Sequence, residues 1–388
     1  MTERFIPYGR QAISEDDIRA VVEVLHSDWL TQGPAVERFE RAVAEYCGAR
    51  YAVAVANGTA ALHLAALAAG FEPGDEVITS PITFVASANC IVYAGARPVF
   101  ADIEGDSYCI DPEAVRGKIG SRTRGLIPVH FAGQPCAMGA LSALATEHGL
   151  RVIEDAAHAI GASYTLDGET FKVGACAHSD MTIFSFHPVK HLTTGEGGMI
   201  TTNDPELYTT LCQLRTHGIT RDPDRLEKQD GPWYYEQQML GFNYRITDLQ
   251  CALGCSQLTR LDAFVERRRA IAACYDTAFA GKSELILPVQ KGNARSSWHL
   301  YVLGFNSLDR KEAFEALRDR GLGVNVHYLP VHLQPFFRDR IGCAPGDCPV
   351  AEVYYGRSLS LPLYPGMSDD DVRYVIDAVL DTVAELQA

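Results

Sequence analysis

The sequence carries little positive charge for its length. Its 388 residues include 34 lysines and arginines against 49 aspartates and glutamates, which gives a formal net charge of −15. Contacts with a nucleic-acid backbone require a basic surface, so this balance argues against DNA or RNA as a partner. A small phosphorylated molecule is not excluded, because a few local arginines or backbone amides can bind phosphates inside an acidic protein.

Paired cysteines and long apolar runs are also missing. The eleven cysteines are spread along the chain without a CxxC pair, which fits reduced thiols in the cytosol better than a disulfide framework. Cys251 and Cys255 would share a helix face with no histidine near them, so we expect packing and no metal site. The start, MTERFIPYGR, lacks an apolar signal core, and no apolar run reaches membrane-spanning length. We therefore expect a cytoplasmic protein without a membrane partner.

Two common phosphate-binding motifs are absent as well. No GxGxxG follows a strand-like run and no GxxxxGK[ST] occurs, and GEGG at 195–198 is too short to replace them. Dinucleotide-binding and P-loop interpretations therefore lack their phosphate-binding elements.

Short β-branched runs alternate with helical segments over much of the chain. From 98 to 180 this alternation predicts a doubly wound α/β fold with a mostly parallel sheet. From about 283 the pattern changes to that of a smaller α+β unit. We expect a large α/β domain over 1–255, a small C-terminal α+β domain over 256–388, and a cleft between them.

One lysine stands out in the segment TIFSFHPVKHLTTGEGGMITTN (182–203). Lys190 lies between two strand-like runs, in a hydroxyl-rich turn that ends at Gly195, Gly197 and Gly198. Apolar neighbours destabilise the ammonium form of a lysine, so its amine becomes available to attack an aldehyde. A solvent-exposed hairpin lysine would give the same pattern, since most lysines lie on the surface.

A carboxylate ends a strand-like run upstream of this lysine. Asp155 follows Val152 and Ile153 in RVIEDAAHAIGA, and ligands of α/β sheets bind at the carboxyl ends of strands. Pyridoxal phosphate chemistry needs a lysine for the aldehyde and a carboxylate that keeps the pyridine nitrogen protonated. Asp155 and Lys190 are candidates for that pair, although Asp155 could instead cap the turn that follows it.

An anion site is predicted near residue 58. YAVAVANGTAALHLAALAAG indicates a strand, a turn and an alanine-rich helix, which places Gly58, Thr59 and Ala60 at a helix N-terminus. The free amides and the dipole there favour a phosphate. The same residues would also serve as a simple helix cap.

Several strings carry a resemblance to a known family. They are NGTAALHLA (57–65), SPITFVAS (80–87), VIEDAAHA (152–159), FSFHPVKHLTTGEGG (184–198) and GFNYR (241–245). They resemble the pyridoxal-phosphate-dependent nucleotide-sugar aminotransferases of the DegT/DnrJ type, and the resemblance covers nearly the whole chain in order. It implies a fold-type I enzyme, similar to aspartate aminotransferase. IPYGRQAI, SDWLTQGP, PVHFAGQP and VNVHYLPVHLQP are most similar to the 4-aminotransferases of pseudaminic acid synthesis.

The resemblance implies roles for individual residues. Lys190 would bind the cofactor covalently, Asp155 would protonate its ring, and Phe84 would stack on that ring. Where many members have glutamine, this chain has His158 to contact the phenolic oxygen. Ser185 and Thr59 would hold the phosphate together with Gly58 and Ala60. Asn243 would reach the phosphate bound by the neighbouring subunit, which implies a homodimer with shared active sites.

The resemblance also implies the reaction. L-glutamate would donate an amino group to C4 of a UDP-linked 4-keto-6-deoxy-N-acetylhexosamine, with pyridoxamine phosphate as the aminated form of the cofactor. The candidate substrate-binding residues are Tyr8, Trp29, Thr31, Arg245, His327 and Tyr328. Alternatives are another sugar or position, or a non-catalytic pyridoxal-phosphate-binding regulator. Dehydratases of the family carry histidine in place of Lys190, so the sequence favours transamination.

Three further expectations concern single elements. Residues 14–28 predict an amphipathic helix capped by Ser14, with its apolar residues on one face. The polar segment 221–237 predicts an exposed excursion. One helix is expected over 246–279, with the three arginines 267–269 on its exposed face.

Overall fold

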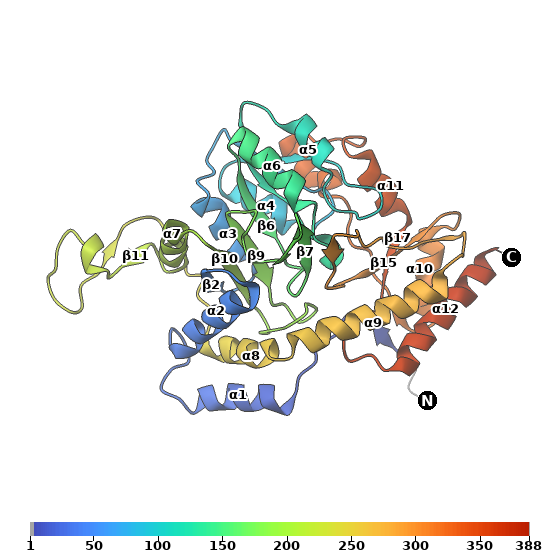
Figure 1. The fold of residues 1–388 in the computed structure, drawn as a ribbon, viewed down its shortest axis with the longest axis horizontal. Coiled ribbons are helices and arrows are strands. Elements are labelled where there is room, and N and C mark those ends of the chain that lie inside the picture. Colours follow the sequence, from blue (N-terminus) through green and yellow to red (C-terminus); the bar gives the residue numbers. More distant parts are fainter. Residues whose placement is uncertain (1–3, 388) are drawn as a thin grey trace.

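The computed structural model describes residues 4–387, which are organised around a seven-stranded mixed sheet (Figure 1). The strands lie in the order β2 (Tyr51–Val55), β10 (Gly198–Thr202), β9 (Met181–Ser185), β6 (Arg151–Asp155), β5 (Thr123–Ile127), β3 (Glu76–Thr79) and β4 (Arg97–Phe100). β10 runs antiparallel to both of its neighbours, and the other neighbouring strands pair in parallel. This confirms the predicted α/β fold with a mostly parallel sheet.

The register of the central sheet places two candidate residues side by side. Asp155 is the last residue of β6, and it lies opposite Ile183 of the neighbouring β9. Ser185 ends β9 and pairs with Gly198 of β10. Because β2, β6 and β9 run in one direction, their carboxyl ends meet at one edge of the sheet, where ligands of such folds bind.

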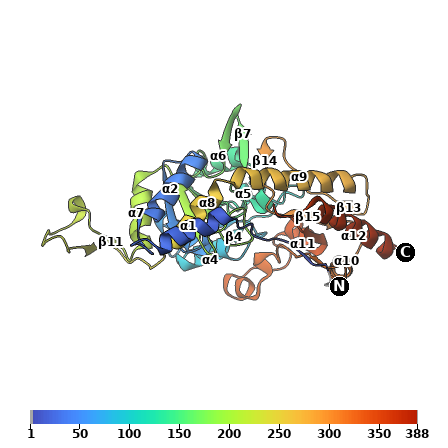
Figure 2. The same ribbon diagram turned by 90° about the horizontal axis from the view of Figure 1, so that it is seen from below.

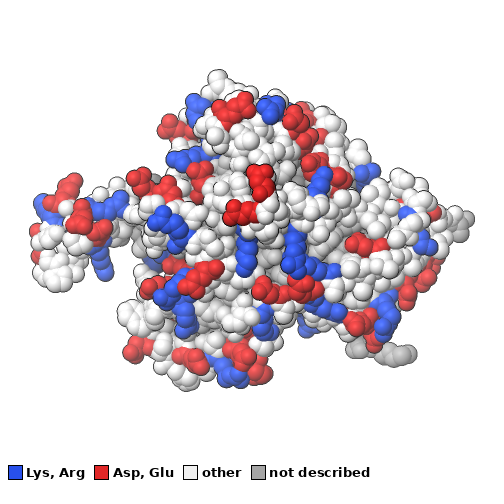
Figure 3. Space-filling model, viewed as in Figure 1, with Lys and Arg blue, Asp and Glu red and all other residues white. Residues whose placement is uncertain are grey.

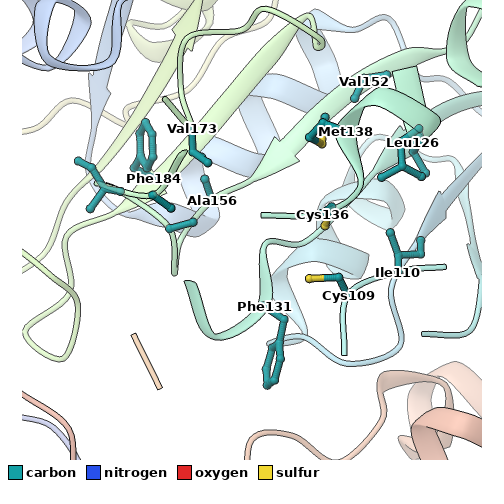
Figure 4. Close-up of a cluster of buried hydrophobic side chains, with 14 of the residues drawn as sticks. Cys109, Ile110, Leu126, Phe131, Cys136, Met138, Val152, Ala156, Val173 and Phe184 are labelled. Atoms are coloured by element: carbon teal, nitrogen blue, oxygen red, sulfur yellow. The ribbon is translucent and has the colours of Figure 1, made fainter. Parts of the chain in front are cut away.

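Helices cover both faces of the sheet (Figure 1). One face packs against α3 (Gly58–Ala68), α4 (Ala86–Tyr93) and α7 (Pro205–Arg215). The other packs against α2 (Pro34–Cys47), α5 (Pro112–Lys118), α6 (Met138–His148) and α8 (Asp248–Leu258). Figure 4 shows part of this second core, where Phe131, Met138 and Phe184 are buried. Within residues 4–387, no helix has both the length and the apolar character needed to cross a membrane.

A smaller unit with its own core follows the central sheet. Its antiparallel sheet consists of β13 (Leu285–Ile286), β15 (Tyr301–Phe305) and β17 (Ser358–Leu361). It packs with α9 (Leu261–Phe279), α10 (Arg310–Asp319) and α12 (Asp369–Gln387), while α11 (Pro349–Arg357) joins the first core. Ile6 also enters the smaller core, because β1 (Ile6–Pro7) pairs with β16 (Leu322–Gly323). The division expected between 255 and 256 falls inside α8 and stays a prediction.

The remaining elements are short. β7 (Ser163–Leu166), β8 (Glu169–Lys172) and β14 (Ala294–Arg295) form a separate small sheet. Single turns of 3-10 or π-helix occur at Phe131–Gly133, Pro223–Arg225, Val331–Leu333 and Phe337–Ile341. β11 (Ile219–Thr220) and β12 (Glu236–Gln237) pair at the base of an arm formed by 219–237. The arm projects from the body (Figure 1), as the lack of apolar periodicity in 221–237 predicted. It carries charges of both signs (Figure 3).

Helix α1 (Glu15–Leu25) differs from the expected orientation. Ser14 caps it through a capping box with Asp17, as predicted from the N-terminal pattern. Asp17 is fully buried, however, where it accepts hydrogen bonds from Ser256 and Gln257. Three apolar residues lie on the outer side, where Ile18, Val22 and Leu25 are 48%, 41% and 55% exposed, whereas Val24 is buried. The buried face of α1 therefore carries Asp17, with its tertiary hydrogen bonds, as well as the apolar Val24.

The helix expected over 246–279 is divided. α8 ends near Thr259 and packs on α1 and α2, and α9 then extends toward α12 of the smaller unit (Figures 1 and 2). The expectation that the three arginines form an exposed face is wrong for Arg268, which is 0% exposed. Arg267 instead pairs with Asp369 near the surface. Contacts with the smaller unit enclose Arg268, which helical periodicity could not show.

Candidate active site

A cavity of about 810 Å³ lies at the carboxyl edge of the central sheet. It collects side chains from the ends of β6 and β9, from the start of α3, and from the segments around 84, 190 and 325–328. The candidate residues that line it are Tyr8, Gly58, Thr59, Ala60, Phe84, Asp155, His158, Ser185, Lys190, His327 and Tyr328. Segments far apart in the sequence thus form one site between the two units.

Lys190 enters this cavity from the turn after β9. The turn is closed by the Lys190 amide, which donates to the carbonyl of His187 at 2.9 Å. Burial lowers the pKa of the Lys190 amine to about 8, and the charge of Asp155 acts in the opposite direction. A substantial fraction of the amine is therefore neutral near physiological pH, as a nucleophile requires.

Asp155 is held from two sides. Its Oδ2 accepts a hydrogen bond from the Ser87 hydroxyl at 2.6 Å, and its Oδ1 accepts one from the Ala157 amide at 3.1 Å. The second contact shows that Asp155 also caps the following turn. Its role toward a cofactor ring stays a prediction. Burial raises the pKa of Asp155, whereas these donors and Lys190 oppose the rise. A carboxylate in this setting is stabilised by a cationic partner.

The start of α3 forms a cradle for an anion. Asn57 caps the helix by accepting from the Ala60 amide at 2.8 Å. Gly58 lies so close to β9 that a Cβ there would come within 2.9 Å of the Ser185 Cβ. The Ser185 hydroxyl therefore lies beside the first amides of α3, and this donor set suits a phosphate.

Aromatic side chains also line the cavity. The Tyr328 hydroxyl and His158 Nε2 are 3.2 Å apart, and the rings of Tyr8 and His327 are 5.2 Å apart. Burial keeps the pKa of His158 well below its ordinary value, so this histidine is neutral. Phe84 is 59% exposed although it lines the cavity. The ring of Phe84 is thus accessible to a planar ligand in the cavity.

Four predicted residues lie outside this cavity. Trp29 is 54% exposed, and Thr31 pairs with Thr247 in an isolated bridge. Arg245 borders a separate cavity of about 310 Å³, and Asn243 is exposed and pairs with Thr216. Within one chain, these four side chains do not join the site that contains Lys190.

Sequence reasoning missed the partner of Asp155. Ser87 is buried at the start of α4 and bonds the Thr83 hydroxyl at 2.6 Å as well as Asp155. The string SPITFVAS contains the sequence signal for this contact, because Thr83 and Ser87 lie four residues apart on either side of the candidate residue Phe84. Among residues 4–387 no group of three or more histidine, cysteine or acidic side chains is arranged to hold a metal ion.

Comparison with known proteins identifies the family. The family model described as DegT/DnrJ/EryC1/StrS aminotransferase matches residues 11–380. The chain belongs to this family. It is accordingly a sugar aminotransferase, and its cofactor is pyridoxal phosphate.

Individual relatives match along nearly the full length. The chain is 46% identical to the spore coat polysaccharide biosynthesis protein SpsC of Bacillus subtilis, over 98% of this chain and 97% of that protein. Helicobacter pylori PseC, an aminotransferase involved in the biosynthesis of pseudaminic acid, shares 31% identity with a TM-score of 0.89, over 98% and 100%. The putative sugar aminotransferase Spr1654 of Streptococcus pneumoniae, in its PMP-form, shares 30% identity with a TM-score of 0.90, over 98% and 100%. Its PLP-form matches equally well, with a TM-score of 0.90. These structures confirm fold-type I.

The residues of the cavity fit pyridoxal phosphate. The anion cradle at α3 and the Ser185 hydroxyl suit its phosphate, and buried Asp155 suits a protonated ring nitrogen. Lys190 supplies an amine with a lowered pKa on the same cavity wall. The bound cofactor would contribute an aldehyde and an electron-withdrawing ring.

Proposed function

We propose that this protein transfers an amino group from L-glutamate to C4 of a UDP-linked 4-keto-6-deoxy-N-acetylhexosamine, as in pseudaminic acid synthesis. One observation carries the proposal: Lys190 and Asp155 line one cavity in a chain that is similar over 98% of its length to PseC. The proposed location is the cytoplasm, which the eleven free cysteines support.

Each residue has one task in the proposed reaction. Lys190 would hold the cofactor and, once displaced by the donor amine, move a proton between the substrate carbon and the cofactor. Asp155 would keep a proton on the ring nitrogen. The amides at Gly58 and Thr59, with the Ser185 hydroxyl, would bind the phosphate and so orient the ring without entering the chemistry.

The acceptor sugar is tested by product analysis. Purified protein is incubated with L-glutamate and each of a set of defined UDP-linked keto sugars, and the aminated carbon is located by NMR. Amination of C4 of the 4-keto-6-deoxy-N-acetylhexosamine supports the proposal. Preference for another sugar or carbon would favour the alternative of a different nucleotide-sugar aminotransferase, which the 46% identity to SpsC keeps open.

A non-catalytic regulator is the second alternative. Glutamate should convert the visible absorbance of the bound cofactor into that of pyridoxamine phosphate if the protein is an enzyme. A regulator that merely retains the cofactor would show no such conversion. The test needs no sugar, so it separates the class of protein from the identity of the acceptor.

A homodimer with shared sites is the proposed assembly. α1 exposes an apolar stripe of Ile18, Val22 and Leu25, and Leu240 beside the arm is 80% exposed. Apolar surface of this kind marks interfaces between proteins. Asn243 is exposed next to the same arm, so a second subunit would be needed to bring it near a cofactor phosphate.

A further inference from the structure

Arg268, in the middle of α9, is a buried cation without a counter-ion. Its side chain is 0% exposed and forms no ion pair with any residue in the 4–387 range. Nη1 donates to the carbonyls of Trp298 (3.3 Å), His299 (3.1 Å) and Leu363 (2.7 Å). Nε and Nη2 have no hydrogen-bond partner in the described part of the chain. A buried charge left uncompensated is costly, so the positive charge itself needs an explanation.

A row of buried histidines leads from Arg268 to the cofactor site. The His299 ring lies 4.4 Å from the ring of His158 and 5.5 Å from that of His191, which directly follows Lys190. His191 Nε2 is 3.0 Å from the Ser297 carbonyl. The His299 amide donates to the Ala132 carbonyl at 2.8 Å, and the His299 carbonyl accepts from Arg268. Hydrogen bonds therefore hold the backbone of His299 on both sides. Arg268 therefore supports the wall behind Lys190.

We propose that Arg268 is a positioning residue of the Lys190 site: a buried cation, held by three carbonyls behind the histidine row, that favours the neutral amine of Lys190. The inference rests on the proposed role of Lys190 in binding the cofactor. Arg268 does not line the cavity that contains Lys190. We therefore assign its effect to its charge and to no direct contact with a ligand.

The other groups around Lys190 do not supply this charge. His187 and Glu196 line the same cavity as Lys190. The groups that interact with Lys190 through charge are Asp155, His158, His191, His299 and His327, together with Arg268. Burial holds the pKa of each of these histidines far below its ordinary value, so they are neutral. Asp155 favours the ammonium form, whereas burial and the charge of Arg268 lower the pKa of Lys190 to about 8. Arg268 is the charged group that acts on the pKa of Lys190 in the same direction as burial, with a smaller effect than that of Asp155.

The test measures the amine directly in apoprotein. Pyridoxal phosphate attaches when the neutral Lys190 nitrogen bonds the aldehyde carbon and the aldehyde oxygen leaves as water, so the attachment rate rises with pH through the pKa of the amine. Rates are followed by absorbance for wild type, Arg268→Gln, Arg268→Met and Arg268→Lys. Arg267→Gln is the matched control. It also removes one positive charge, but from the neighbouring residue, which pairs with Asp369 near the surface. Melting curves establish which variants fold.

Charge removal at Arg268 should raise the midpoint of this profile by about one pH unit. Arg268→Lys, which keeps the charge, and Arg267→Gln should keep the wild-type midpoint. An unshifted midpoint in a folded Arg268→Gln or Arg268→Met protein overturns the inference. It is also overturned if both neutral variants fail to fold while Arg268→Lys folds, because the requirement is then structural. Peptide mapping separates the two ideas: attachment to a lysine other than Lys190 refutes the proposed function, whatever the midpoint.

Discussion

At the scale of single residues, the proposed chemistry depends on how burial and neighbouring charges shift the pKa values of Lys190 and Asp155. Burial lowers the pKa of Lys190 to about 8 and raises the pKa of Asp155, so burial alone would make both groups neutral. Ser87 and the Ala157 amide favour the carboxylate form of Asp155. The site thus keeps a nucleophilic amine beside a carboxylate that can accept a cationic partner.

Replacing Lys190 with alanine should abolish turnover and leave part of the cofactor affinity, because the phosphate cradle at α3 is unchanged. Borohydride reduction of wild-type protein followed by peptide mapping locates the attached lysine. Lys172→Ala is the control, since Lys172 donates to the Tyr46 carbonyl away from the cavity. A pyridoxyl label on any lysine other than Lys190 would contradict the assignment.

Asp155→Asn should reduce kcat by several powers of ten, because the amide cannot hold a proton on the ring nitrogen. Each factor of ten corresponds to about 1.4 kcal/mol of barrier, so such a loss exceeds what slight misplacement explains. Asp180→Asn serves as the control. Asp180 accepts a hydrogen bond from Arg151 at the other end of β6 and β9, away from the cavity. Near-normal kcat in Asp155→Asn would refute the proposed role.

Ser87→Ala should lower kcat by about tenfold, because Asp155 loses a buried donor of a strength near 1.5 kcal/mol. The loss should be far smaller than for Asp155→Asn, since the Ala157 amide still holds the carboxylate. Ser142→Ala removes a comparable hydroxyl on α6 and should leave kcat unchanged. If Ser87→Ala matches wild type in steady-state assays, its hydrogen bond does not tune the carboxylate.

At the scale of elements, close packing of α3 on β9 and β10 creates the anion cradle. A Cβ at Gly198 would lie 2.5 Å from the Asn57 carbonyl oxygen, and one at Gly58 would lie 2.9 Å from the Ser185 Cβ. Glycine at both positions lets the helix start approach the strands, which brings its amides to the Ser185 hydroxyl. The cradle is therefore a property of three elements together.

Gly58→Ala should weaken pyridoxal phosphate binding by about tenfold, because overpacking of roughly 1–3 kcal/mol moves α3 away from β9. The dissociation constant is measured by titrating apoprotein and following absorbance. Gly117→Ala is the matched control, since Gly117 lies within α5 and nothing lies within 4 Å of its added Cβ. An unchanged dissociation constant in folded Gly58→Ala would show that the close approach does not matter for binding.

At the scale of the whole molecule, exposed apolar side chains and an extended arm indicate that one chain does not bury all of its contact surface. Trp233 in the arm is 72% exposed, and Leu25 of α1 is 55% exposed. Asn243 does not line the cavity that contains Lys190 in its own chain. In the proposed homodimer, an interface would cover the exposed apolar side chains and a shared site would give Asn243 a role.

Asn243→Ala should weaken cofactor retention in the proposed homodimer, since a ligand bound between subunits also stabilises their association. The sharper test mixes Asn243→Ala chains with Lys190→Ala chains. In a mixed dimer one site carries both lesions and the other carries neither, so activity should reappear. If the mixture stays inactive after subunit exchange has been demonstrated, Asn243 acts within its own chain and the shared-site model is wrong.

The sequence by itself determined those features that depend on neighbouring residues. Alternating runs indicated the α/β sheet, a strand end indicated Asp155, and NGT indicated the start of α3, while Ser185 came from the family resemblance. Local patterns report strand, helix and turn directly, and the carboxyl ends of parallel strands meet at one edge. That rule predicted Asp155 at the ligand-binding edge, whereas the pairing of Asp155 with Lys190 rested on the two groups that pyridoxal phosphate chemistry needs.

Only the tertiary structure decided which side of an element is buried and which distant groups meet. Asp17 of α1 is buried because it bonds Ser256 and Gln257, more than two hundred residues away, whereas Glu15, Asp16 and Glu23 are exposed. Arg268 is enclosed because carbonyls of the smaller unit converge on it. The physical reason is that a buried polar group is tolerated when its partners are present, and those partners come from parts of the chain that no local pattern links.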